Sequence, residues 1–190
     1  MRTTKIAWNG RKPNVALAGL TPAQRRLFQT AFHEAGHALM HLLCGSRFDY
    51  ASVRPRLADA GRVVGPPAEG RLMVVLLGGI AGRLFLERKV DLSDGTYDSD
   101  LAEFIHVANE KAHKSCIADE FRWQLRGAAE QLLEHNDSLK VLARELVLNH
   151  RVTYRQATRL LSDEGCERAL KPCADWQLLR ELRRRRRFGI

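Results

Sequence analysis

Two histidines four residues apart, with a glutamate beside the first, form the segment His33-Glu34-Ala-Gly-His37. On an α-helix, positions i and i+4 project from the same face one turn apart, so both imidazoles can direct a ring nitrogen to one Zn²⁺. Glu34 would lie beside the ion without binding it. There it could accept a proton from zinc-bound water as that water attacks a peptide carbonyl. The spacing is typical of a zinc peptidase, although two helix histidines are also compatible with ordinary core or surface positions.

The helix that this motif requires is indicated by the local sequence. Thr21 followed by Pro22 and Gln24 is a capping box with a proline at the first helical position. Apolar residues then recur at helical spacing until Gly45, which favours a helix over about 22–44. Gly36 inside this helix costs about 1 kcal/mol relative to alanine. We therefore expect another backbone to approach closely there.

A catalytic zinc site needs a third protein ligand. His41 continues the same helical face, but it is eight residues from His33, about 12 Å along the axis, so we predict that it supports the core instead. The longer pattern H-E-x-x-H-x-x-G-x-x-H is not met, because Met40 and Leu43 occupy the positions of its glycine and third histidine. The ligand must come from elsewhere in the chain. An acidic stretch offers four carboxylates, most of which we expect to serve in turns and helix caps: Asp91, Asp94, Asp98 and Asp100.

The remaining pattern predicts a mainly α fold with a small β-ribbon. The ribbon would consist of strands at 48–56 and 62–64, and the edge of the first is a candidate site for an extended peptide. A helix at about 68–87 is apolar nearly all round, which indicates a central position. A loop is expected at 88–99. Tyr97 within it could line a substrate cleft, but an ordinary loop aromatic is the favoured interpretation. Further helices are expected at about 100–117, 119–135, 137–149 and 153–162.

From the length and the distribution of charge we expect one domain with a shorter segment on each side of it. We assign residues 1–20 to an irregular arm, 21–163 to the domain, and 164–190 to a linker and basic tail. The net charge is +9, and residues 171–190 supply +5 of it, with seven basic and two acidic side chains. The run Arg183–Arg187 could contact nucleic acid, but a solvated basic end is the favoured interpretation.

Several classes of protein are disfavoured by what the sequence lacks. The most apolar run, Leu72 to Gly82, is far shorter than the roughly 20 residues of a membrane span. The first residues lack the apolar centre of a signal peptide, and the four cysteines have no C-x-x-C spacing, so we expect a cytoplasmic protein. No G-x-x-x-x-G-K-[ST] motif is present, and we expect no ATP binding by this chain.

Four stretches carry a family resemblance: AFHEAGHAL, VVLLGGIAGRLFL, SDLAEFIHVA and LLEHNDSLKVLARELVLNHRVTYRQATRLL. In this order they resemble the peptidase domain of FtsH-type ATP-dependent zinc metalloproteases, over about residues 21–161. The resemblance implies a helical zinc-peptidase domain in which His33 and His37 bind zinc and Glu34 is the catalytic base. It implies Asp100 as the third ligand. Asp98 stays open as an alternative, because the spacing from Gly95 is one residue longer than in the family.

The expected function is that of a zinc-dependent metalloendopeptidase without its own ATPase. Its substrates would be flexible or unfolded protein or peptide segments. The alternative is a peptidase-like regulatory or partner-binding module that acts with an ATPase or another protein in trans. The sequence leaves the oligomeric state open.

Overall fold

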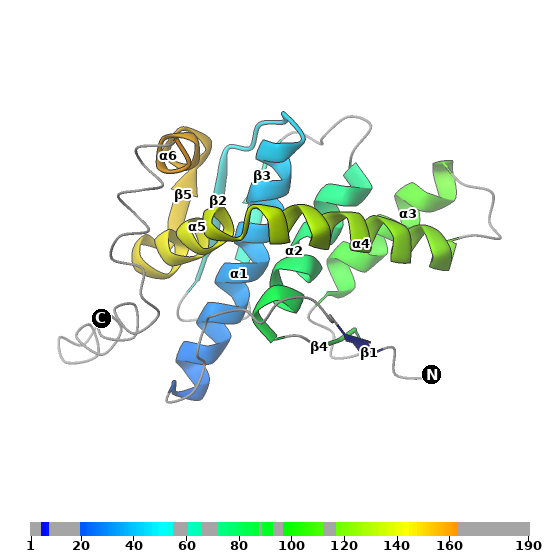
Figure 1. The fold of residues 1–190 in the computed structure, drawn as a ribbon, viewed down its shortest axis with the longest axis horizontal. Coiled ribbons are helices and arrows are strands. Elements are labelled where there is room, and N and C mark those ends of the chain that lie inside the picture. Colours follow the sequence, from blue (N-terminus) through cyan, green and yellow to red (C-terminus); the bar gives the residue numbers. More distant parts are fainter. Residues whose placement is uncertain are drawn as a thin grey trace.

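The computed structural model describes residues 5–7, 20–54, 61–65, 72–87, 89–92, 97–111 and 117–162 (Figure 1). This part of the chain is mainly helical with small antiparallel sheets, which confirms the predicted fold class. The basic tail with Arg183–Arg187 lies outside the described residues. His113, in the chain between residues 111 and 117, also lies outside them. The helices are α1 (Pro22–Leu43), α2 (Leu72–Glu87), α3 (Asp98–Lys111), α4 (Ile117–Glu134), α5 (Asn136–Asn149) and α6 (Tyr154–Leu160).

Helix α1 begins as its sequence predicts. The backbone N–H of Gln24 donates to the Thr21 hydroxyl at 3.3 Å, and the Gln24 side chain accepts from the Thr21 N–H at 3.0 Å. These bonds satisfy two of the donors that a helix start leaves without partners. Helix α1 ends at Leu43, almost two turns after the histidine motif, and Gly45 follows with a φ of 70°. A left-handed conformation of this kind favours glycine.

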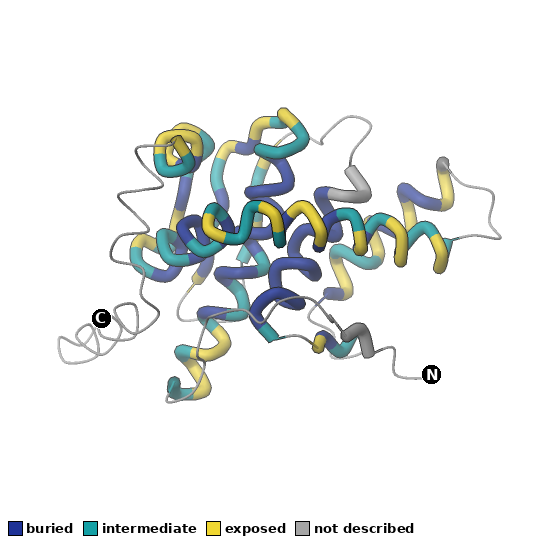
Figure 2. Tube along the Cα trace, viewed as in Figure 1, coloured by how far each residue is buried: buried dark blue, intermediate teal, exposed yellow. Residues whose placement is uncertain are grey.

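Helix α2 is the central element. Its described side chains from Val75 to Leu86 are all buried, and Figure 2 shows this helix dark blue over most of its length. It packs between α1 on one side and α4 on the other, and α5 covers another part of α1. A Cβ at Gly36 of α1 would collide with the carbonyl oxygen of Gly78 in α2. The close backbone approach expected at Gly36 is therefore confirmed.

The larger sheet has three antiparallel strands in the order β3 (Gly61–Val64), β2 (Tyr50–Val53) and β5 (Arg151–Thr153). The prediction that the first ribbon strand offers an edge is wrong, because β2 is paired on both sides. The strand β5 was not predicted. It has only three residues, and it is held by a partner about 100 residues earlier in the chain. Among the described strands of this sheet, the edges are β3 and β5.

A second sheet joins segments that were expected to be irregular. In the 1–20 arm, β1 (Lys5–Ala7) pairs antiparallel with β4 (Lys89–Asp91) in the 88–99 loop, with Ile6 opposite Val90. Helix α3 starts at Asp98, two residues before the expected start. Three-residue strands carry too few residues to show an alternating pattern, so their pairing is a tertiary effect.

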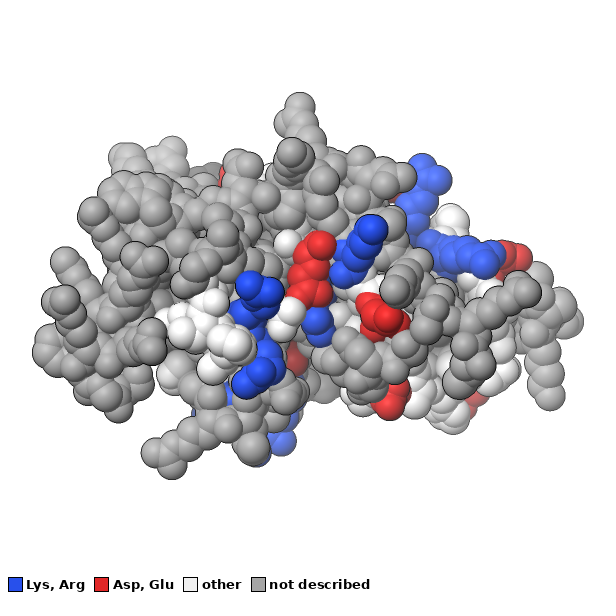
Figure 3. Space-filling view, turned by 90° about the horizontal axis from the view of Figure 1, so that it is seen from below, with Lys and Arg blue, Asp and Glu red and all other residues white. Residues whose placement is uncertain are grey.

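The outer surface carries charges of both signs. Figure 3 shows lysine and arginine side chains next to aspartate and glutamate side chains on the face seen from below. None of the helices in the described ranges has the length and apolar character needed to cross a membrane.

Candidate metal centre

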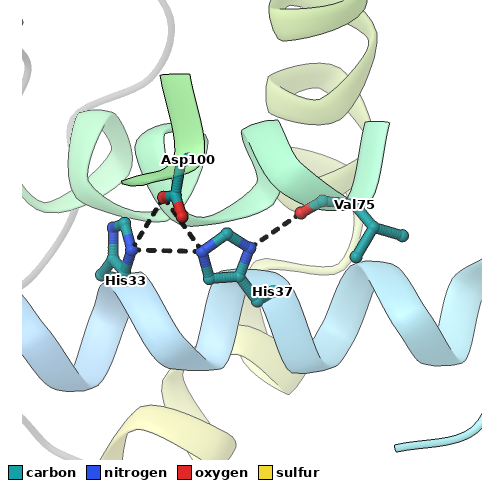
Figure 4. Close-up of polar contacts among 4 residues, drawn as sticks. All are labelled: His33, His37, Val75 and Asp100. Atoms are coloured by element: carbon teal, nitrogen blue, oxygen red, sulfur yellow. Dashed lines mark hydrogen bonds and ion pairs between the residues drawn. The ribbon is translucent and has the colours of Figure 1, made fainter. Parts of the chain in front are cut away.

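Three side chains from two helices converge on one point (Figure 4). His33 and His37 come from α1, and Asp100 comes from the first turn of α3. Oδ2 of Asp100 lies 3.1 Å from Nε2 of His33 and 3.2 Å from Nε2 of His37. The two histidine Nε2 atoms are 3.1 Å apart. These three residues form a group that could hold a metal ion.

The size of this group suits a small divalent ion. The three donor atoms lie 3.1–3.2 Å from one another, a separation that one ion with ligand distances of ~2.0–2.1 Å could bridge. Two imidazoles and one carboxylate are ligands that zinc accepts, and three protein donors leave a fourth position for water or substrate. The three side chains are only 10–15% exposed, so the group is sheltered but still reachable.

The backbone of α2 orients His37. Nδ1–H of His37 donates to the carbonyl oxygen of Val75 at 2.8 Å, which leaves Nε2 facing Asp100. Gly79, one turn further along α2, lies under both imidazoles, and a Cβ there would collide with the rings of His33 and His37. Helix α2 thus supplies one acceptor and the space for the rings. No side-chain pattern in the sequence can indicate a carbonyl acceptor such as that of Val75.

The ring of His33 packs against the buried ring of Tyr97. Tyr97 is 0% exposed, and its ring centroid is 5.8 Å from that of His33. The guanidinium of Arg83 lies 5.1 Å from the Tyr97 ring centroid, and it donates to Glu87 at 3.1 Å. Tyr97 is therefore a core residue that supports the site, and the expectation of an ordinary loop aromatic was wrong. Arg83 was missed, although an Arg–Glu pair four residues apart in an apolar helix is a signal that could have drawn attention to it.

The charges of the three residues favour one another. Burial alone would lower the pKa of His37, but the Asp100 carboxylate raises it to about 9. Burial would raise the pKa of Asp100, yet the two neighbouring histidines hold it well below its usual range. Burial lowers the pKa of His33. Asp100 is thus an anion beside a protonated His37, and a metal ion bound at this point would take the place of that proton.

Glu34 lies beside this group on α1 and is 4% exposed. Burial raises its pKa to about 8. Among the described residues, its Oε2 has no hydrogen-bond partner. The first residue of β3 comes so close that a Cβ at Gly61 would collide with the Glu34 side chain. A buried carboxyl oxygen without a protein partner costs about 1–3 kcal/mol unless water or another group bonds to it.

Within the described residues, Asp98 and the other histidines are not members of this group. Asp98 is exposed and is not part of the group formed by His33, His37 and Asp100. His41 is buried and its Nδ1 is 2.9 Å from the Ser46 hydroxyl, which confirms its assignment to the core. His106 is an exposed partner of Glu110 on α3. His150 ends α5 with a φ of 61°.

No model of a known protein family matches this sequence, and no curated protein does.

Proposed function

We propose that the protein is a zinc-dependent metalloendopeptidase that hydrolyses peptide bonds in flexible or unfolded protein segments, without an ATPase of its own. The observation that carries the proposal is the position of Glu34. It is a buried carboxylate next to a sheltered His33–His37–Asp100 group, and its Oε2 has no hydrogen-bond partner among the described residues. A site built only to hold a structural ion would not need this side chain.

Zinc is the proposed metal because of the donor set. Catalytic zinc sites typically have three protein ligands, such as two neutral imidazoles and one carboxylate, and leave the fourth coordination position free. When bound, zinc would polarise a peptide carbonyl and increase the acidity of water. The protein would hold the ion with His33, His37 and Asp100, and Val75 would keep His37 in the tautomer that presents Nε2.

Glu34 would move the proton. As a carboxylate it would accept a proton from the attacking water, and as a carboxylic acid it would return this proton to the departing amine. A pKa raised toward neutral pH suits a group that must both accept and donate. Because the side chain is 4% exposed, little bulk water competes for that proton.

The edge strand β3 offers a place for an extended peptide. It is paired on one side only within the described part of the chain, and its first residue, Gly61, lies against Glu34. An extended segment could add to this edge through main-chain hydrogen bonds. Such binding requires an unfolded segment, which supports flexible substrates. This assigns to β3 the role that was first expected of the 48–56 strand.

The family proposal rests on the order of the four resembling stretches. The motif helix, the glycine-rich second helix and an aspartate in the first turn of a third helix occur here as α1, α2 and α3. We propose on this basis a peptidase domain of the FtsH type. These 190 residues contain no phosphate-binding loop motif, so they would not themselves supply unfolding driven by ATP.

The decisive variant is Glu34→Gln, which keeps the shape of the side chain but removes the base. We expect it to retain the metal and to lose at least about 100-fold in the cleavage rate of a flexible fluorogenic peptide or casein. Metal content by plasma mass spectrometry and cleavage rate would be measured on the same samples. Glu103→Gln, at an exposed position of α3, is the matched control and should leave both unchanged.

Wild-type protein that binds zinc but shows no Glu34-dependent cleavage would contradict the proposal. It would favour the alternative, a peptidase-like regulatory or partner-binding module. In that case, partner capture would be unaffected by Glu34→Gln.

A further inference from the structure

Within the described residues, the outward positions of the three-stranded sheet carry arginines and no acidic residue. Ala51, Val53 and Val152 point into the core, so alternate residues of the strands point outward. The outward positions include Arg62 of β3 and Arg151 of β5, both exposed. The exposed residue that follows β2 is also an arginine, Arg54. These three arginines, with Tyr50 of β2, are called the arginine face.

The strand register brings the charges together. Ser52 of β2 is opposite Arg62 on one side and opposite Arg151 on the other. The two arginines are thus two strand spacings apart, about 10 Å, on one face. Like charges at this separation repel one another, although salt screens the repulsion because about 10 Å is close to one Debye length. No aspartate or glutamate occupies β2, β3 or β5 to offset the repulsion.

These arginines differ from others in the structure. Arg83, Arg122 and Arg126 each pair with a carboxylate on their own helix. No ion pair within the described part of the chain involves a member of the arginine face. Their charge is therefore available to an anion from outside.

Tyr50 orients two of these guanidinium groups. The Arg151 guanidinium lies 4.0 Å from the Tyr50 ring centroid, which is stacking distance. Arg62 lies 5.7 Å from the same centroid, and its Nη2 donates to the Tyr50 hydroxyl at 2.8 Å. Planar guanidinium groups that are held on an aromatic ring can stack with nucleobases and also bind phosphate. Carboxylates of an acidic peptide would use the charge but not the planar surface.

We propose that the arginine face binds single-stranded nucleic acid, with phosphates on Arg54, Arg62 and Arg151 and with bases stacked on the guanidinium planes that Tyr50 orients. This site is on the outer side of the sheet. The metal centre lies on the inner side, where Gly61 of β3 comes up against the Glu34 side chain. The binding does not depend on peptidase activity. It also does not use the Arg183–Arg187 run of the tail.

The test is fluorescence anisotropy of labelled oligouridylate and oligothymidylate with the full chain, at several salt concentrations. Wild type should bind. The double variant R62A/R151A should bind more weakly, and the slope of log affinity against log salt should become shallower by about 1.4, because each lost phosphate contact changes this slope by ~0.7. The matched control is R122A/R126A, which removes the same charge from exposed helix positions and should leave both quantities unchanged. Circular dichroism would confirm that both pairs fold.

Two variants separate stacking from charge. R62K/R151K keeps the two positive charges but removes the planar groups. It should keep the salt dependence and lose at least about fivefold in affinity. The same variant tests the proposal if R62A/R151A fails to fold. Tyr50→Leu should lose a similar amount because the guanidinium groups would no longer be oriented. Lysine and leucine variants with wild-type affinity would overturn the proposal.

Three further results would overturn it. One is no binding by the wild type. Another is equal competition by an acidic peptide at the same charge concentration, which would assign the face to acidic proteins. The third is loss of binding on neutralising Arg183–Arg187 while R62A/R151A binds normally, which would assign the contact to the tail.

Discussion

The environment of His41 determines its charge. It is four residues after His37 on α1, 8% exposed, with its ring 6.0 Å from that of Phe48. Burial, together with the nearby charge of His37, lowers its pKa to about 4. At neutral pH His41 is therefore an uncharged core side chain bonded to Ser46. Protonating it would place an imidazolium in the core.

This leads to a prediction about acid stability. In the unfolded chain the pKa of His41 is about 6.5. As the pH falls below that value, the unfolded state binds a proton that the folded state does not yet bind. The free energy of unfolding therefore decreases between about pH 6.5 and 4. From pH 7 to 5 the loss from this residue is about 2 kcal/mol. Urea unfolding of wild type and His41→Gln at both pH values measures it. Equal acid losses in the two proteins would contradict the assignment.

Of the two candidate aspartates, only Asp100 lies against the histidines. Two helix positions that are two residues apart point about 200° from each other, so only one can face α1. The sequence indicated the carboxylates but not the start of α3. Because α3 starts at Asp98, Asp100 faces the histidines and Asp98 is exposed.

At the scale of elements, the site depends on how closely α1 and α2 cross. Gly36 and Gly82 face one another, and Gly78 contacts the same region of α1. The crossing places Val75 and Gly79 of α2 against the two imidazoles. A wider separation of the helices would remove the acceptor for His37 and change the distance between the ligands.

We predict that two glycine-to-alanine changes have opposite effects on the free energy of unfolding, one at the crossing of α1 and α2 and one away from it. Gly36→Ala puts a methyl group into the Gly78 carbonyl, and we expect a loss of about 1–3 kcal/mol from overpacking. Gly127→Ala in α4 is the matched control. Nothing lies within 4 Å of a Cβ there, so alanine should stabilise the helix by about 0.5–1 kcal/mol. Urea unfolding gives both values. A Gly36→Ala protein as stable as wild type would show that the helices do not cross so closely.

Local signals predicted some elements well and others not at all. The capping boxes at Thr21 and Thr153 mark the starts of α1 and α6, because the bonds that define them are made within four residues. The strands β1, β4 and β5 have three residues each, and their bonds go to distant segments. Such strands are decided by their partners.

At the scale of the whole molecule, the candidate ligands connect distant parts of the chain. His37 and Asp100 are 63 residues apart, and the residues between them include β2, β3 and α2. An ion would tie α3 to α1 directly. Since such a group does not exist in the unfolded chain, binding energy would add to the free energy of unfolding.

We therefore predict that zinc raises the melting temperature. At about 100 times its Kd, zinc should stabilise the protein by about 2.7 kcal/mol, or about 5–10 °C for a chain of this size. Removing zinc with EDTA should reverse the shift. The shift should persist in Asp98→Ala and be largely lost in Asp100→Ala, measured within each variant with and without metal. A full shift in Asp100→Ala would exclude Asp100 as a ligand.

The sequence alone determined the mainly helical fold, the position of α1, and the two histidines with their glutamate, because helical spacing and capping are local properties. Tertiary structure decided which aspartate joins them, that Tyr97 and Arg83 lie behind His33, and that β2 is a central strand. The physical reason is that these contacts join segments far apart in the chain, and only the packing of α1, α2 and α3 brings them together.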